Sequence, residues 1–126
     1  MITVGKIGFK SQRIAQEFDN LGDDLKGAVY HLADHLRVQY EKKTVLTCIL
    51  RTAEENAGVG GAKKSLHMSN RAVDVRTNNL NLADTIKQDI AAWFLSRYPK
   101  KHWEFVIHGT IFDSKTEHFH IGQRVV

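Results

Sequence analysis

The stretch KTVLTCIL, residues 43–50, is the clearest indication of the fold. It is dense in β-branched and apolar side chains, which is typical of a buried strand. The segments AVDVR at 72–76, WEFVIH at 103–108 and HFHIG at 118–122 predict three further strands. The residues between the last two strands, 109–117, are expected to form a long hairpin connection. Together these segments indicate a small, mainly antiparallel sheet.

Helices are predicted on the N-terminal side of the first of these strands. Ser11 is expected to cap a short helix ending at Asn20, and Asp23 or Asp24 a longer one reaching about Tyr40. The longer segment carries apolar residues at helical spacing, which form the stripe Leu25, Val29, Leu32, Ala33 and Leu36.

A third helix is predicted over 82–98, with a turn before it and Asn81 as its cap. Pro99 follows this segment, where a proline is common after a helix end. Helices, strands and loops in this order predict an α+β fold with helices packed on one face of the sheet. Residues 1–10 are expected to be extended or loosely attached, and 51–64, which contains three glycines, to form a long loop.

Length and composition favour one globular domain spanning residues 1–126. The apolar fraction is 42% and the charged fraction 25%, values that exclude disordered and fibrous classes. Cys48 is the only cysteine, so a disulfide framework and a four-cysteine zinc site are excluded. No apolar run is long enough for a membrane helix or a secretory signal. The net charge of +4 favours anionic partners such as nucleic acid or a bacterial wall.

The chain has seven histidines, and four of them are not expected to carry chemistry. His31 and His35 have the four-residue spacing of a metalloprotease helix, but Leu32 stands where that motif needs glutamate. We therefore expect this pair to be solvated on a helix surface. His102 and His108 have no partner at ligand spacing.

The segment SLHMSNRAVD, residues 65–74, contains the first candidate ligands. His67 precedes the predicted strand and Asp74 lies on it, and a turn at Ser69 and Asn70 can bring the two side chains together. An imidazole nitrogen and a carboxylate oxygen are both good Zn²⁺ ligands. Alone, this spacing is a weak signal.

The segment EHFH, residues 117–120, supplies what the first one lacks. On a strand, His118 and His120 point to one face and Phe119 to the other. His120 can then complete a set of three protein ligands with an open fourth position, which describes a catalytic zinc site. Such a site needs a carboxylate for proton transfer, and Glu117 is the candidate.

These segments resemble the LAS-type zinc peptidases, which include D-alanyl-D-alanine carboxypeptidases and L-alanyl-D-glutamate endopeptidases of phage lysis. The family pattern is a strand ending in an arginine-containing turn, then S-x-H-x-x-G-x-A-x-D, and later E/D-x-x-H or H-x-H. Arg51 ends the first strand, 65–74 fills the second motif, and 117–120 satisfies both forms of the last. The resemblance covers 44–76 and 103–122.

The resemblance implies one zinc ion per chain, held by His67, Asp74 and His120. It makes Glu117 the general acid/base for hydrolysis by metal-activated water.

It also implies roles around the metal. Arg51 would bind substrate or steady the oxyanion of the tetrahedral intermediate, for which a fixed positive charge is suited. His118 is expected to assist there or to line the cleft, and Ser65 to bond near the ligand loop and contribute to the substrate site.

Two positions depart from the family pattern. Asn70 replaces the usual glycine, but asparagine is the non-glycine residue that best tolerates a left-handed backbone, so the turn can survive. Phe119 stands where proline or tryptophan often precedes the last ligand. These departures bear on substrate choice more than on the metal site.

The resemblance predicts a cell-wall peptide hydrolase. The substrate would be a peptidoglycan stem peptide, cleaved by a carboxypeptidase or an endopeptidase reaction, and the sequence does not decide between them. A short basic chain without a leader fits a phage-type enzyme that is made in the cytoplasm and reaches the wall after release. No nucleic-acid partner is expected, and a monomer is favoured.

Two other functions compete with this one. A metal-dependent nuclease of the His-hydrophobic-His kind would use His118 and His120 with Tyr98 as nucleophile, which explains the basic charge but leaves His67 and Asp74 unused. A non-catalytic zinc-binding module of the same fold is the other alternative, against which Glu117 argues.

Overall fold

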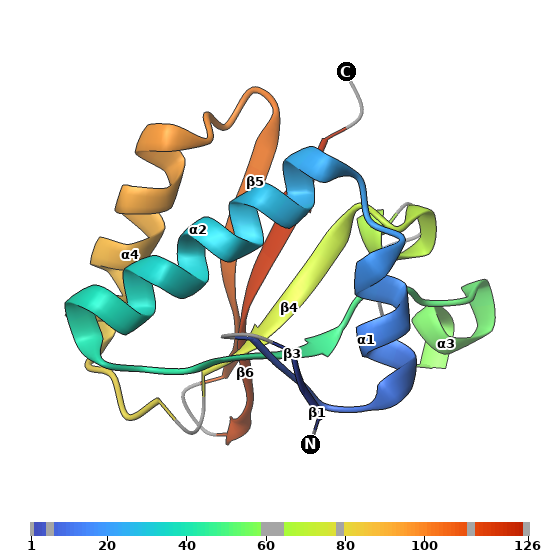
Figure 1. Ribbon diagram of the computed structural model, residues 1–126, viewed down its shortest axis with the longest axis horizontal. Helices are drawn as coiled ribbons and strands as arrows, with labels where there is room; N and C mark the ends of the chain where they lie inside the picture. Colours follow the sequence, from blue (N-terminus) through green and yellow to red (C-terminus); the bar gives the residue numbers. More distant parts are fainter. Residues whose placement is uncertain (1, 5–6, 59–64, 78–79, 111–112, 125–126) are drawn as a thin grey trace.

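The computed structural model of the chain describes residues 2–4, 7–58, 65–77, 80–110 and 113–124 (Figure 1). These form a six-stranded sheet in the order β1-β2-β3-β4-β6-β5. The strands are β1 (Ile2–Val4), β2 (Ile7–Phe9), β3 (Thr44–Cys48), β4 (Ala72–Arg76), β5 (Trp103–Thr110) and β6 (Asp113–Gln123). The helices are α1 (Gln12–Asp19), α2 (Asp23–Tyr40), α3 (Ala53–Gly58), the 3₁₀ helix η1 (Leu66–Ser69) and α4 (Asp84–Arg97).

The predicted α+β class and the mainly antiparallel sheet are confirmed. Only the β2–β3 pair is parallel among the described strands, and the remaining neighbours are antiparallel. The β4–β6 register places Asp74 directly opposite His120, and Arg76 opposite His118. This register brings two segments that lie about forty residues apart in the sequence to the same place.

Residues 1–10 were expected to be extended or loosely attached, and the described part of this segment is extended and belongs to the sheet. Residues 2–4 and 7–9 form β1 and β2, and β2 pairs with β3. The side chains of Ile7 and Phe9 are fully buried, at 0% and 2% exposure. Burial of these two apolar side chains against the helices holds the segment in the sheet.

The predicted helices are confirmed, but two of their caps differ. Ser11 caps α1, since its side-chain oxygen accepts a hydrogen bond from the backbone N–H of Ile14 at 3.3 Å. The cap of α2 is Gly22, so Asp23 and Asp24 lie in the first turn, where negative charge interacts favourably with the helix dipole. The cap of α4 is Ala83 rather than Asn81.

Two segments predicted as connections contain regular structure. Within 51–64, residues 53–58 form α3, while 59–64 lie outside the described residues. Most of 109–117 belongs to strands, because β5 continues to Thr110 and β6 begins at Asp113. Gly109 adopts a φ of 112° opposite the backbone of Glu117, where the β5–β6 register shifts. This bulge, which glycine favours, allows the two strands to continue past it.

The two faces of the sheet differ in character. Val73, Val75, Phe119 and Ile121 belong to one continuous core with the buried side chains of α1, α2 and α4. Strand alternation therefore directs the residues between them to the other face. In Figure 1, α2 crosses over the sheet and α4 lies beside β5. Asp74, His118 and His120 thus lie on the face that these helices leave uncovered.

His31 is exposed on the surface of α2, as expected, whereas His35 is half-buried, and both rings also contact Trp93. His35 stacks on Trp93 with ring centroids 3.8 Å apart, and His31 meets the same indole edge-on at 5.1 Å. Tyr98 also makes a hydrogen bond with Nδ1 of His31, at 3.1 Å. The pair contributes to the packing of α2 against α4.

No described helix has the length and apolar character needed to cross a membrane.

Candidate metal centre

His67 is positioned by a single 3₁₀ turn between the loop and β4. The Ser65 side chain begins this turn by accepting a hydrogen bond from the backbone N–H of His67, at 3.3 Å. Asn70 ends the turn in the left-handed conformation, with φ of 59°. The expectation that asparagine can replace the glycine of the pattern is confirmed at this position.

Asp74 is the point at which the two distant segments meet. Its Oδ1 lies 3.0 Å from Nε2 of His67 and 3.4 Å from Nδ1 of His120. All three side chains are buried, with His67 at 2% exposure, Asp74 at 4% and His120 at 8%. Two imidazole nitrogens therefore converge on one carboxylate oxygen.

The second nitrogen of His67 has a separate partner. Nδ1 lies 2.8 Å from the backbone oxygen of Ile49, which accepts a hydrogen bond from the N–H at that position. The ring is thereby held with Nε2 toward Asp74. In zinc proteins, a hydrogen bond of this kind fixes the tautomer and leaves the inner nitrogen free to bind the metal.

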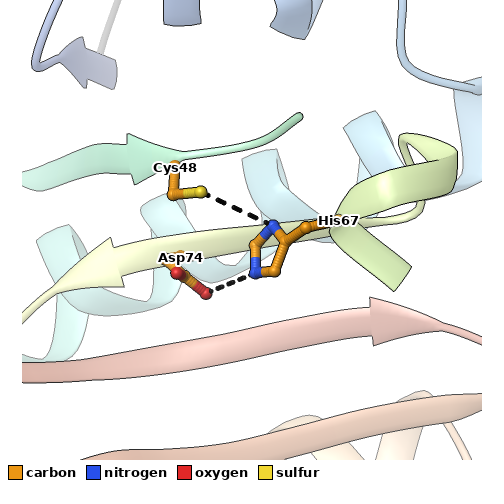
Figure 2. Close-up of side chains that lie close together, drawn as sticks. All are labelled: Cys48, His67 and Asp74. Atoms are coloured by element: carbon orange, nitrogen blue, oxygen red, sulfur yellow. Dashed lines mark hydrogen bonds and ion pairs between the residues drawn. The ribbon is translucent and has the colours of Figure 1, made fainter. Parts of the chain in front are cut away.

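Cys48 also approaches His67, on the other side of the ring. Its Sγ lies 3.8 Å from Nδ1, and ligand atoms of Cys48, His67 and Asp74 fall within 4.8 Å of one another, a group to which His120 does not belong. Figure 2 shows that the thiol and the carboxylate approach opposite nitrogens of the imidazole. Because Nδ1 already donates to Ile49, the geometry favours Nε2 as the ligand atom, and Nε2 faces Asp74 rather than Cys48.

The charges of this cluster are strongly coupled. Burial lowers the pKa of His67, but the hydrogen bonds with Asp74 and Cys48 and the charge of the carboxylate outweigh burial and raise the pKa to about 9. For Asp74, burial raises the pKa, but the hydrogen bonds from His120 and His67 lower it by more, so the pKa of Asp74 lies well below its usual range. The metal-free centre is thus a buried ion pair between His67 and Asp74.

Arg51 reaches the same carboxylate from the loop after β3. Its guanidinium Nη2 is 3.5 Å from Oδ2 of Asp74, and Nη1 donates to the side-chain oxygen of Asn56 at 3.3 Å. Asn56 is buried on α3, a helix that the ion pair between Arg13 and Glu55, at 2.9 Å, ties to α1. Arg51 remains 20% exposed, so it borders the centre and also faces solvent.

His118 lies on the same face as His120, as the alternation predicts. Its Nε2 is 3.6 Å from Oδ2 of Asp74, and the side chain is 25% exposed. His108, which showed no partner in the sequence, packs against it across the strands, with ring centroids 5.5 Å apart. Only the β5–β6 register reveals this neighbour, because His108 and His118 are directly opposite each other.

Glu117 is not brought to this cluster. Its Oε1 lies 2.6 Å from Nζ of Lys87 on α4 and accepts a hydrogen bond from the Thr77 hydroxyl at 2.8 Å. Burial raises the pKa of Glu117, but these two bonds outweigh it, and the pKa is lowered overall. Strand alternation gives Glu117 the orientation of Phe119, toward the helices, and opposite to that of His118 and His120.

Tyr98, the nucleophile of the nuclease alternative, is also remote from the two histidines of 118–120. It follows α4 directly, stacks on Phe94 at 4.6 Å and bonds to His31 of α2. These contacts place it on the helix-covered face. The structure therefore gives the nuclease alternative no support.

The donor atoms of the cluster fit zinc. Two imidazole nitrogens and one carboxylate oxygen form a set typical of catalytic zinc sites, in which a fourth position stays open. The partly exposed side chains of Arg51 and His118 lie beside this set, both within 4 Å of Oδ2 of Asp74. The arrangement can bind a divalent metal next to polar side chains that are accessible to a substrate.

The sequence model of the family described as peptidase M15 matches residues 3–106. This range includes Arg51, His67 and Asp74 and ends before His118 and His120. No curated protein and no solved structure matches the chain.

Proposed function

Because the chain belongs to the peptidase M15 family of zinc peptidases, we propose that it is an active zinc peptidase whose metal is held by His67, Asp74 and His120. The family includes D-Ala-D-Ala carboxypeptidases and endolysins. One observation supports the ligand set above all others: Nε2 of His67 and Nδ1 of His120 both meet Oδ1 of Asp74, at 3.0 and 3.4 Å.

Zinc bound by this set would polarise a peptide carbonyl and lower the pKa of a coordinated water. The chain contributes the burial and the orientation of the three ligands. His67 must give up its proton for this, so its high pKa makes metal binding a competition with protons.

Arg51 is the residue that we assign to the substrate. Its guanidinium is always charged and presents a planar set of donors that suits a carboxylate or a developing oxyanion. One edge is held by Asn56 and Asp74, which fixes its orientation, while a fifth of the side chain stays exposed. Preorganised donors of this kind stabilise negative charge in a transition state.

Proton transfer has two candidates, Glu117 and His118. The sequence resemblance assigns the role to Glu117, whose carboxylate is engaged by Lys87 and Thr77 and whose pKa is lowered. A general base works best with a pKa near the operating pH, which a lowered carboxylate pKa does not provide. His118 is accessible and adjoins the metal ligands, so we propose His118 as the proton acceptor and keep Glu117 as the alternative.

The proposed substrate is a peptidoglycan stem peptide. The resemblance to cell-wall peptidases supports this class, and a net charge of +4 would hold the enzyme near an acidic wall. The site is compatible with both carboxypeptidase and endopeptidase action. Arg51 can bind either a terminal carboxylate or the oxyanion that forms when an internal peptide bond is attacked. Action at the bacterial wall after release from the producing cell is part of this proposal.

The decisive experiment is digestion of purified peptidoglycan, with the products analysed by mass spectrometry. We expect new peptide termini with the zinc-loaded protein, none after treatment with a chelator, and recovery when zinc is restored. The control is Asp74→Ala, which removes the shared ligand. Release of peptides at the same rate by Asp74→Ala and wild-type protein would refute the proposal.

The same experiment tests the non-catalytic alternative. A zinc-binding module would bind one zinc per chain but release no peptide from any wall preparation. Metal content and product release must therefore be measured on the same sample.

A further inference from the structure

The outer nitrogen of His120 meets a carboxylate that the sequence analysis did not single out. Nε2 of His120 lies 3.3 Å from Oε2 of Glu104 on β5. We propose that Glu104 is a positioning residue, which sets the tautomer of His120 and thereby strengthens zinc binding. This inference rests on the proposed function, because it concerns the same metal.

Strand pairing gives Glu104 its place. In the β5–β6 register, Glu104 is opposite Gly122 and Val106 is opposite His120. All of these residues alternate onto the face that carries the metal centre, so Glu104 reaches His120 along the diagonal of a cross-strand pair. Its side chain is 26% exposed, which places it at the border between the buried ligands and solvent.

Gly122 leaves the room that this contact needs. A Cβ at Gly122 would lie 3.2 Å from Nε2 of His120 and 2.7 Å from Cδ1 of Leu66. A side chain at this position, two residues further along the same strand, would therefore press on the imidazole and on Leu66. The absence of a side chain leaves the imidazole the room in which it faces Glu104.

The second oxygen of Glu104 is held as well. Oε1 lies 3.5 Å from Nη1 of Arg124. Arg124 is itself fixed, because its Nε donates to the backbone oxygens of Lys100 and Trp103, at 2.9 and 3.3 Å. The carboxylate is thus anchored at one oxygen and presents the other to His120.

The chemical consequence follows from the two nitrogens of one imidazole. When Nε2 carries the proton and donates it to Glu104, Nδ1 keeps a lone pair with which it can bind zinc. A carboxylate acceptor also makes the ligating nitrogen more basic. His67 is oriented in the same way by the backbone oxygen of Ile49, so each metal-ligating histidine has its own outer partner.

The test is zinc affinity, measured by competition with a chromophoric chelator on wild-type protein, Glu104→Ala, Glu104→Gln and Asp89→Asn. Asp89 is an exposed carboxylate on α4, so its variant removes the same charge away from the metal centre. We expect Glu104→Ala to weaken zinc binding about 10- to 100-fold, the usual effect of losing an outer partner. Glu104→Gln keeps an acceptor oxygen and should fall between it and wild type, while Asp89→Asn stays within about twofold.

Metal-free melting temperatures, measured in parallel, separate this effect from a general loss of stability. A zinc affinity of Glu104→Ala within about twofold of wild type would overturn the proposal. If Glu104→Ala does not fold, long-range ¹H–¹⁵N spectra of the zinc-loaded wild type decide. A proton on Nε2 of His120 supports the proposal and a proton on Nδ1 overturns it. Failure of the wild type to bind zinc would refute the proposed function itself.

Discussion

Replacing Asp74 by Asn tests the buried ion pair at the centre without changing its shape. In the metal-free protein, Asp74 accepts a hydrogen bond from His67 and holds the pKa of that imidazole at about 9, against an ordinary value of 6.5. The variant removes the negative charge. Burial then dominates and lowers the pKa of His67, so the imidazole loses its proton at a lower pH than in wild type.

The magnitude follows from the pKa of His67. A pKa raised from 6.5 to about 9 corresponds to roughly 3 kcal/mol of folding free energy, at about 1.4 kcal/mol for each pKa unit. The His67 side chain is 2% exposed, so solvent screening does not reduce this figure substantially. Because the folded-state pKa is raised, this stability is fully present below about pH 6.5 and is lost as the pH rises through about 9.

We therefore expect Asp74→Asn to be less stable than wild type by a margin that depends on pH. Urea unfolding with a chelator present should show the margin shrinking by roughly 3 kcal/mol between about pH 6 and about pH 9.5. The ion pair of Asp74 with Arg51 persists over this range and leaves a constant remainder. Asp89→Asn is the charge-matched control and should differ from wild type by a small, constant amount. If the stability difference between Asp74→Asn and wild type also stayed constant with pH, the ion pair between Asp74 and His67 would be refuted.

Three further predictions concern the metal and the reaction. Zinc affinity should rise about tenfold per pH unit up to about pH 9, because the proton on His67 must leave; chelator competition at several pH values measures this slope. Cys48→Ser should keep one zinc per chain with an affinity within a few-fold of wild type, and a loss of about a hundredfold would place the thiol among the ligands. His118→Gln should reduce peptide release about 100-fold or more with zinc retained, whereas Glu117→Gln should stay within about tenfold; the reverse order would assign proton transfer to Glu117.

The helices and the central strands could be predicted because their patterns are long. The apolar stripe of α2 repeats over several turns, and β3 and β4 are dense in β-branched residues. The two N-terminal strands have three residues each, which is too short for any periodicity. They exist because β2 pairs with β3 and buries Ile7 and Phe9, and the sequence does not show that pairing.

The helix caps show a second limit. A helix N-terminus was expected at Asn81, since asparagine is a common cap, but the backbone of Asn81 is left-handed and the helix begins after Ala83. Neither Ala83 nor Gly22 caps its helix with a side chain. Tertiary packing of Ile90 and Phe94 places α4 instead, and such packing outweighs a cap of about 1 kcal/mol.

The metal centre could be predicted in part from strand alternation. Alternation correctly puts His118 and His120 on one face, and the β4–β6 register then brings Asp74 opposite His120. The same rule applied one residue earlier puts Glu117 with Phe119 on the other face. Glu117 was chosen for its closeness to His120 in the sequence, both from the residues alone and from the family pattern, and sequence spacing does not specify the face of the sheet.

The outer partners of the two histidines could not be predicted, although they orient both imidazoles. The backbone oxygen of Ile49 and the carboxylate of Glu104 each bind the outer nitrogen of one histidine, at 2.8 and 3.3 Å. Neither partner is near its histidine in sequence, and neither belongs to a motif. Both histidines are therefore oriented by contacts that form only when the sheet is complete. It follows that a substitution on β5, far from any proposed ligand in the sequence, should weaken zinc binding, because it removes the outer partner of a proposed ligand.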